Sequence, residues 1–182
     1  MRLTIVFALA LTVAAQDHRY SSKPSAPGGK SKGVTRVKNA IEFTPDGVFL
    51  QKAAEDNAFV IEFDSWAKIH GESGNVRTTA SELAFLETKL GDDLRKLAGK
   101  KHVTLPEKVN DRDAAERARI DPADTDRSFV EQVLRRYDQE IVSFDREARA
   151  ASDPDIKSFA ADGVVTLQKH RRMVEVLQDK LR

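Results

Sequence analysis

The feature that most limits the possible folds of this chain is a stripe of apolar side chains in residues 128–148. Apolar residues recur there at alternating spacings of four and three: Val130, Leu134, Tyr137, Ile141, Phe144 and Ala148. This spacing predicts one face of an α-helix that buries its side chains against other helices. Ser128 and Glu131 match a capping box at its start. Most of the charged residues, including Arg136 and Glu147, fall off the stripe, and we expect them in water.

Three further segments carry the same pattern. The first begins at Thr44-Pro45-Asp46, where an N-cap precedes a proline and an acid, and it continues to Gly71. The second covers about residues 76–98, with Gly99 as its stop. The last restarts after Asp153-Pro154 and runs to the C-terminus. No segment keeps the two-residue alternation of a strand for long, so the sequence predicts an all-α fold.

The lengths of the connections predict how these helices are arranged. Residues 71–75 and 150–153 are short links, so helices one and two, and helices three and four, should form antiparallel hairpins. Residues 100–125 are long enough to cross a bundle about 35 Å tall. A long crossover between helices two and three defines a ferritin-like four-helix bundle. We prefer it to an up-down-up-down bundle with a long loop.

The first 43 residues have a different character. Residues 1–15 combine Met1-Arg2, an uncharged apolar run and small residues before Gln16, which predicts a signal peptide. The run is too short to span a bilayer. We therefore expect a secreted, periplasmic protein whose mature chain has no transmembrane anchor. Residues 16–43, rich in Ser, Pro, Gly and Lys, should be a disordered basic linker, either a spacer or an arm attracted to an anionic envelope surface. Residues 44–182 then form the bundle domain.

Composition excludes several kinds of site. The chain has no cysteine, which excludes disulfides, thiolate zinc sites and cysteine nucleophiles within it. A formal net charge of +1 gives no overall case for nucleic-acid binding. The motifs of serine hydrolases, zinc proteases and nucleotide-binding loops are missing. None of the four histidines follows a glutamate by three residues, so a standard di-iron centre and its cofactor are not expected.

A layer of polar residues is predicted near the middle of the bundle. Glu87 and His170 hold inward positions in their helices, Asp56 interrupts the inward row of the first helix, and Asp138 lies beside the stripe of the third. A buried carboxylate must be paired, hydrogen-bonded or bound to a metal. Three interpretations stay open. Glu87 or Asp138 holds a protonated His170 in a structural network, or His170, Glu87 and Asp138 bind one metal ion, or these residues lie at the surface.

Four segments resemble a known family: FLQKAAEDNAFVIEFDSWAKIHG, DDLRKLAGKKHVTLP, FVEQVLRRYDQEIVSFDREA and LQKHRRMVEVL. They are similar to a bacterial ferritin-like domain-of-unknown-function family whose members are often labelled predicted outer membrane proteins. The resemblance covers about residues 49–181, and its most specific parts are KLAGKKHVTLP and the last helix with its histidine. It implies a secreted protein without an established activity.

The family pattern usually has histidines in its second and third helices, where this chain has Glu87 and Asp138. The last-helix histidine is matched by His170. A glutamate of the first helix is replaced by Val60, while Glu62 remains nearby.

These expectations favour a non-enzymatic protein of the cell envelope that binds an unknown protein or envelope component, or that buffers envelope stress. The alternative is a metal-binding or redox protein with a His/carboxylate site in the middle of the bundle. The two differ in whether His170, Glu87 and Asp138 converge on one centre.

Overall fold

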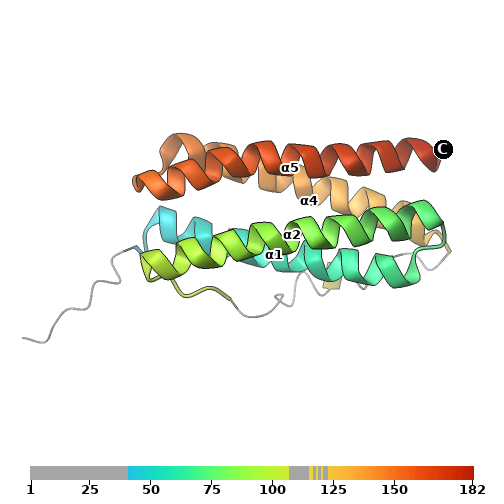
Figure 1. Cartoon of the computed structure of the whole chain (residues 1–182), viewed down its shortest axis with the longest axis horizontal. Helices are drawn as coiled ribbons and strands as arrows, with labels where there is room; N and C mark the ends of the chain where they lie inside the picture. Colours follow the sequence, from blue (N-terminus) through green and yellow to red (C-terminus); the bar gives the residue numbers. More distant parts are fainter. Residues whose placement is uncertain (1–40, 107–114, 117, 119, 121–122) are drawn as a thin grey trace, which may run out of the picture. The chain divides into compact units, whose positions relative to one another are not determined.

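The computed structural model describes residues 41–106, 115–116, 118, 120 and 123–182, which belong to one compact unit. Within these residues the chain forms four helices and no strand (Figure 1): α1 Pro45–His70, α2 Gly74–Lys101, α4 Thr125–Ala150 and α5 Pro154–Lys180. The predicted all-α fold is confirmed. The predicted signal peptide, 1–15, and most of the predicted linker, 16–43, lie outside the described residues.

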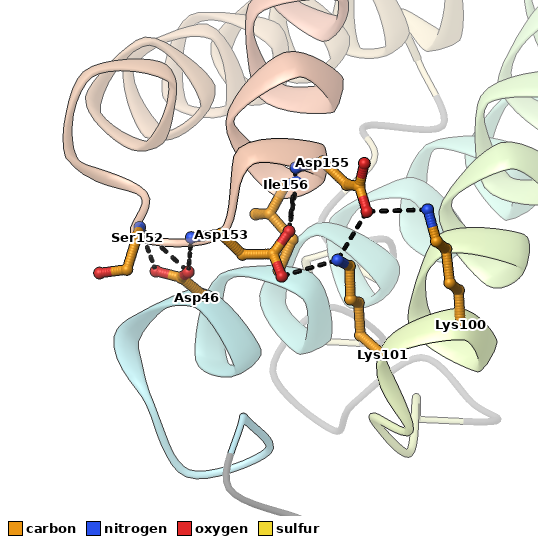
Figure 2. A network of polar contacts seen from close by, with 7 residues as sticks. All are labelled: Asp46, Lys100, Lys101, Ser152, Asp153, Asp155 and Ile156. Atoms are coloured by element: carbon orange, nitrogen blue, oxygen red, sulfur yellow. Dashed lines mark hydrogen bonds and ion pairs between the residues drawn. The ribbon is translucent and has the colours of Figure 1, made fainter.

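The helices pack as two hairpins. α1 lies along α2 and α4 along α5, and the hairpins meet through α1 against α4 and α2 against α5 (Figure 1). Asp46, the second residue of α1, joins the hairpins at one end of the bundle. Its carboxylate accepts hydrogen bonds from the backbone N–H groups of Ser152 and Asp153, between α4 and α5 (Figure 2). The start of α1 therefore lies beside the end of α4.

A matching contact joins the hairpins at the opposite end. Asp126, the second residue of α4, accepts hydrogen bonds from the N–H groups of Glu72 and Ser73, between α1 and α2, at 2.7 and 2.8 Å. Asp126, Glu72 and Ser73 are related to the residues of the first contact by a shift of 80 positions, and α1 and α4 both contain 26 residues. The two hairpins thus repeat one arrangement without repeating their sequence. We call these two contacts the aspartate clasps.

The clasps also define the path of the chain. α2 ends at the end of the bundle where α1 begins, because Lys101 forms ion pairs with Asp153 and Asp155 at the start of α5 (Figure 2). α4 begins at the other end, beside the α1–α2 link. The chain between α2 and α4 therefore connects opposite ends of the bundle, and α2 and α4 run in the same direction. This is the long crossover expected from the sequence, in place of an up-down-up-down order.

The helix ends agree with the sequence in part. Thr44 caps α1, as predicted, and Asp153 caps α5 at the predicted restart. The stop at Gly99 was wrong: α2 continues to Lys101, and the left-handed residue that ends it is His102, with φ 57°. The capping box at Ser128 was also wrong. α4 begins one turn earlier, at Thr125, because Asp124 is the N-cap and accepts from the N–H of Arg127.

The core follows the predicted stripes with local rotations. In α5 the buried residues recur at spacings of four and three: Ile156, Ala160, Gly163, Leu167, His170, Val174 and Leu177. In the second half of α2 the buried face is rotated by about one residue. Gly91 and Ala98 are buried there, while the neighbouring Leu90 and Leu97 are half-buried. Arg136 and Glu147 of α4, expected in water, are buried. No helix in the described ranges is both long and apolar enough to cross a membrane.

Candidate functional site

A single carboxylate, that of Glu87 in α2, is the centre of the most developed polar cluster in the interior. Its side chain has no exposed surface. The Tyr137 hydroxyl of α4 donates to Oε1 at 2.9 Å, and Asn57 Nδ2 of α1 donates to Oε2 at 2.8 Å. His170 Nδ1 of α5 lies 2.6 Å from Oε1. One residue from each helix therefore meets at this carboxylate, and we call the four the polar tetrad.

Helical spacing explains why these four side chains point inward. Asn57 lies between Ala53 and Val60 on the buried face of α1, and His170 lies between Leu167 and Val174 on that of α5. Each replaces an apolar residue in an otherwise regular stripe. A polar side chain in that place must find a partner, because burying it without one costs about 1–3 kcal/mol.

The electrostatics of the tetrad favour hydrogen-bond donors around one acceptor. Burial, and then the negative charge of Glu87, raise the pKa of Tyr137, so its hydroxyl keeps its proton and donates. With the carboxylate as acceptor, His170 Nδ1 carries the hydrogen of the 2.6 Å contact. The ring of Tyr137 also packs edge-on against the imidazole, with centroids 6.1 Å apart. Both oxygens of the Glu87 carboxylate thus have hydrogen-bond partners within the protein.

The structure brings together two of the three residues proposed as metal ligands. Glu87 and His170 are in contact, whereas the Asp138 side chain is 57% exposed and accepts a hydrogen bond from Arg171 Nε at 2.7 Å. Within the described part of the chain, no three His, Asp or Glu side chains are grouped so that they could hold a metal ion. A metal bound by His170, Glu87 and Asp138 stays a prediction.

Asp56, the fourth residue of the predicted layer, belongs to a different cluster. It is buried, and it forms an ion pair with Arg136 Nη1 at 2.7 Å and another with Lys52. Arg136 also pairs with Glu116 of the crossover at 2.9 Å and lies 4.2 Å above the ring of Phe59. This ion-pair cluster ties the crossover to the seam between α1 and α4.

Two further carboxyl groups are buried close enough to Glu87 to interact with it electrostatically. Asp64 of α1 is fully enclosed, and neither of its oxygens has a hydrogen-bond partner among the residues that the structure describes. Burial, and next the charge of Glu87, raise the pKa of Asp64. One oxygen of Glu140, in α4, has no hydrogen-bond partner within the described part of the chain, and burial, then Glu87 and Asp56, raise the pKa of this group. Both groups are therefore held toward the neutral, protonated form.

The sequence contained a signal for most of the residues that were missed. Asn57 fills the inward position between Ala53 and Val60, and Glu140 follows Tyr137 by three residues, on the same face of α4. The apolar stripe predicted for α4 passes through Ile141, the next residue, instead. Asp64 follows Val60 by four residues but stands beside the stronger apolar signal of Phe63. Nothing in the sequence alone indicates that Asp64 lacks a partner.

A family model matches residues 34–177, a range that contains the whole tetrad and reaches the last turn of α5. Its description is "Domain of unknown function (DUF4142)". The chain belongs to the DUF4142 family. The family resemblance expected from the sequence is confirmed at this level, and the family description assigns no activity. Comparisons with curated proteins and with solved structures gave no match.

Proposed function

We propose that this DUF4142 protein is a secreted, non-enzymatic helical bundle of the cell envelope that acts by binding, and that its polar tetrad fixes the packing of the helices. One observation carries the proposal. The Glu87 carboxylate, with no exposed surface, has hydrogen-bond partners from all three other helices.

A carboxylate in this state is suited to a structural role. Both of its oxygens are already engaged, so a metal ion or a substrate would have to displace Tyr137, Asn57 or His170 to reach it. A buried polar network specifies one arrangement of helices, because a shift of any helix leaves a buried polar group without its partner. Such a role is best attested where a single polar residue sets the register of packed helices.

Other features support the location and the class of the protein. The apolar run of residues 1–15, followed by small residues, supports export of the chain. The crossover between α2 and α4 supports a ferritin-like arrangement, since such folds have one long connection. An envelope protein or another envelope component is the partner that we propose. Export would be checked by mass spectrometry of protein from the producing cell, where we expect Gln16 as the first residue. An intact N-terminus would contradict this part of the proposal.

A metal-binding or redox role is the second candidate, and a specific observation favours it. Asp64 and Glu140 place additional carboxyl groups in the interior, within electrostatic range of Glu87, and among the described residues some of their oxygens have no hydrogen-bond partner. Buried carboxyl groups in excess of their partners are a feature of carboxylate metal sites in helical bundles.

Metal analysis distinguishes the two candidates. The protein would be purified from its native compartment without a chelating tag, together with the variants His170→Ala and His102→Ala. His102, exposed at the end of α2, is the matched control because its loss leaves the tetrad intact. We expect less than stoichiometric metal in all three proteins. One metal ion per chain that is lost in His170→Ala and kept in His102→Ala would overturn the proposal in favour of the second candidate.

A further inference from the structure

A groove of about 520 Å³ lies between α1 and α2, where the crossover begins. Its walls are mainly apolar and include Ala54, Ala58, Ile61, Leu94, Leu105 and Pro106. Small-molecule sites in proteins have volumes of roughly 300–1,000 Å³ and combine apolar walls with a few polar groups. The groove therefore has the size and the lining of a ligand site, and its polar groups decide which ligand it would accept.

The decisive polar group is the amide oxygen of Asn57, which lines the groove. Asn57 is 5% exposed. Its nitrogen, Nδ2, donates to both the backbone oxygen and the side-chain Oε2 of Glu87, at 3.0 and 2.8 Å. Two acceptors on this side fix which amide atom is the nitrogen, so Oδ1 must lie on the other side. No donor to Oδ1 is found among the described residues.

The absence of a side chain at Gly91 makes room for this oxygen. A Cβ atom at Gly91 would lie 2.3 Å from Asn57 Oδ1, closer than two such atoms can approach. Gly91 thus lets α2 approach Asn57 Oδ1 closely, and both residues line the groove together with Ala54 and Ala58. An amide oxygen without a protein donor, on a residue that is 5% exposed, can accept a hydrogen bond from a molecule bound in the groove.

The charged groups around the groove do not select a charged ligand. The guanidinium of Arg95 lies near Gly91, but its Nη2 is paired with Asp92. Glu62 also lines the groove and has its own interaction. Because one positive and two negative groups stand close together, their fields partly cancel. The chemistry of the groove is therefore apolar walls and one hydrogen-bond acceptor.

We propose that this groove binds a small neutral molecule, mainly apolar, that carries one N–H or O–H donor, as an indole or a phenol does. The donor would bond to Asn57 Oδ1, and the ring would lie against Ala54, Ala58 and Leu94. This proposal rests on the proposed binding function and names a class of ligand for it. Because Asn57 also holds Glu87, an occupied groove is in direct contact with the polar tetrad.

Indole and 1-methylindole form a matched pair of probes, since they differ only in that a methyl group replaces the hydrogen of the N–H donor. Binding to the full chain would be followed by calorimetry and by chemical shifts of the backbone amides. We expect saturable binding of one indole per chain, with the largest shifts in α1 and α2, and a dissociation constant about five- to tenfold higher for 1-methylindole, the effect of one neutral hydrogen bond. Absence of saturable indole binding up to its solubility limit, or equal binding of the two probes, would overturn the proposal.

Two variants test the location without disturbing the tetrad. Ala58→Leu fills the groove, whereas Ala161→Leu adds the same atoms to an exposed position of α5. We expect Ala58→Leu to lose indole binding and Ala161→Leu to keep that of the unmodified protein. Indole binding that survives in Ala58→Leu would overturn the assignment to this groove. Metal analysis is a separate measurement. A metal ion in the tetrad would refute the proposed function, whereas only the indole measurements decide whether the groove binds a ligand.

Discussion

His170 Nδ1 lies 2.6 Å from Glu87 Oε1, in a place where the histidine is 4% exposed and the glutamate is not exposed at all. Breaking a buried pair of this kind by removing one partner is more costly than replacing both, because it leaves a charge without compensation. The pair also connects α2 with α5 in the interior, whereas the ion pairs of Lys100 and Lys101 with Asp155 connect them at one end of the bundle.

The first prediction concerns this pair. His170→Leu should lower the free energy of unfolding by about 3 kcal/mol, since Glu87 keeps only Tyr137 and Asn57 as donors. Glu87→Gln should also destabilise, and the double variant should be less unstable than the sum of the two by at least about 0.5 kcal/mol. Urea unfolding of the three variants measures this coupling. Additive effects would mean that the two side chains do not interact. Asp138→Asn, in an exposed ion pair, is the control and should change stability by less than about 1 kcal/mol.

The second prediction compares two glycines of α2. Gly91→Ala should destabilise by about 1–3 kcal/mol, because the new methyl group would overlap Asn57 Oδ1 and displace the amide from Glu87. Gly99→Ala should stabilise by up to about 1 kcal/mol, because a methyl group there would contact nothing and alanine favours the helix. Thermal unfolding of both variants checks the opposite signs. Stabilisation by both would show that α1 and α2 do not approach closely at Asn57.

The third prediction concerns pH. The pKa of Asp64 is raised in the folded protein by burial and by Glu87, so the folded state holds this proton more tightly than the unfolded state does. The contribution is fully present below the pKa of the unfolded chain, near 4, and is lost as the pH rises toward the folded pKa. Asp64→Asn should therefore stabilise the protein more at pH 8 than at pH 4.

Urea unfolding at the two pH values measures this difference, with the exposed Asp179→Asn as the control. A benefit from Asp64→Asn that is the same at pH 4 and pH 8 would contradict the prediction, because an aspartate with the same pKa in the folded and the unfolded chain adds no pH dependence to stability.

The fourth prediction concerns the aspartate clasps. Asp46→Ala and Asp126→Ala each remove a carboxylate that accepts from two backbone N–H groups, so each should cost about 1.5–3 kcal/mol. The two costs should be similar, because the contacts are equivalent. Chemical denaturation of both variants provides the comparison. A large loss of unfolding free energy in one variant and none in the other would show that the two clasps do not contribute equally to stability.

The fold could be predicted from the sequence because its signals were redundant. The spacing of Ile156, Leu167 and Val174 defines the buried face of α5, and the length of the α2–α4 connection predicts its crossover. The errors arose where several local signals compete. Ser128 has the spacing of a cap, yet Asp124 caps the helix one turn earlier. Gly99 is a residue that often ends a helix, yet it remains within α2, which continues to Lys101.

The site could be predicted only in part, for a different reason. Glu87 and His170 stand out because each interrupts an apolar stripe. Whether Asp138 joins them depends on a rotation of α4 of less than half a turn, which spacing alone does not determine. Tyr137 fits the apolar stripe of α4, and only the three-dimensional arrangement reveals that its hydroxyl reaches Glu87.

The aspartate clasps have a consequence for how the chain folds. Each hairpin provides the carboxylate that completes the turn of the other, so neither hairpin can satisfy the amides of its own turn alone. An isolated hairpin would leave two N–H groups at its turn without the carboxylate that accepts from them in the bundle. Each turn is therefore completed only when the two hairpins pack together. We expect the residues at both ends of the bundle to unfold in one cooperative transition.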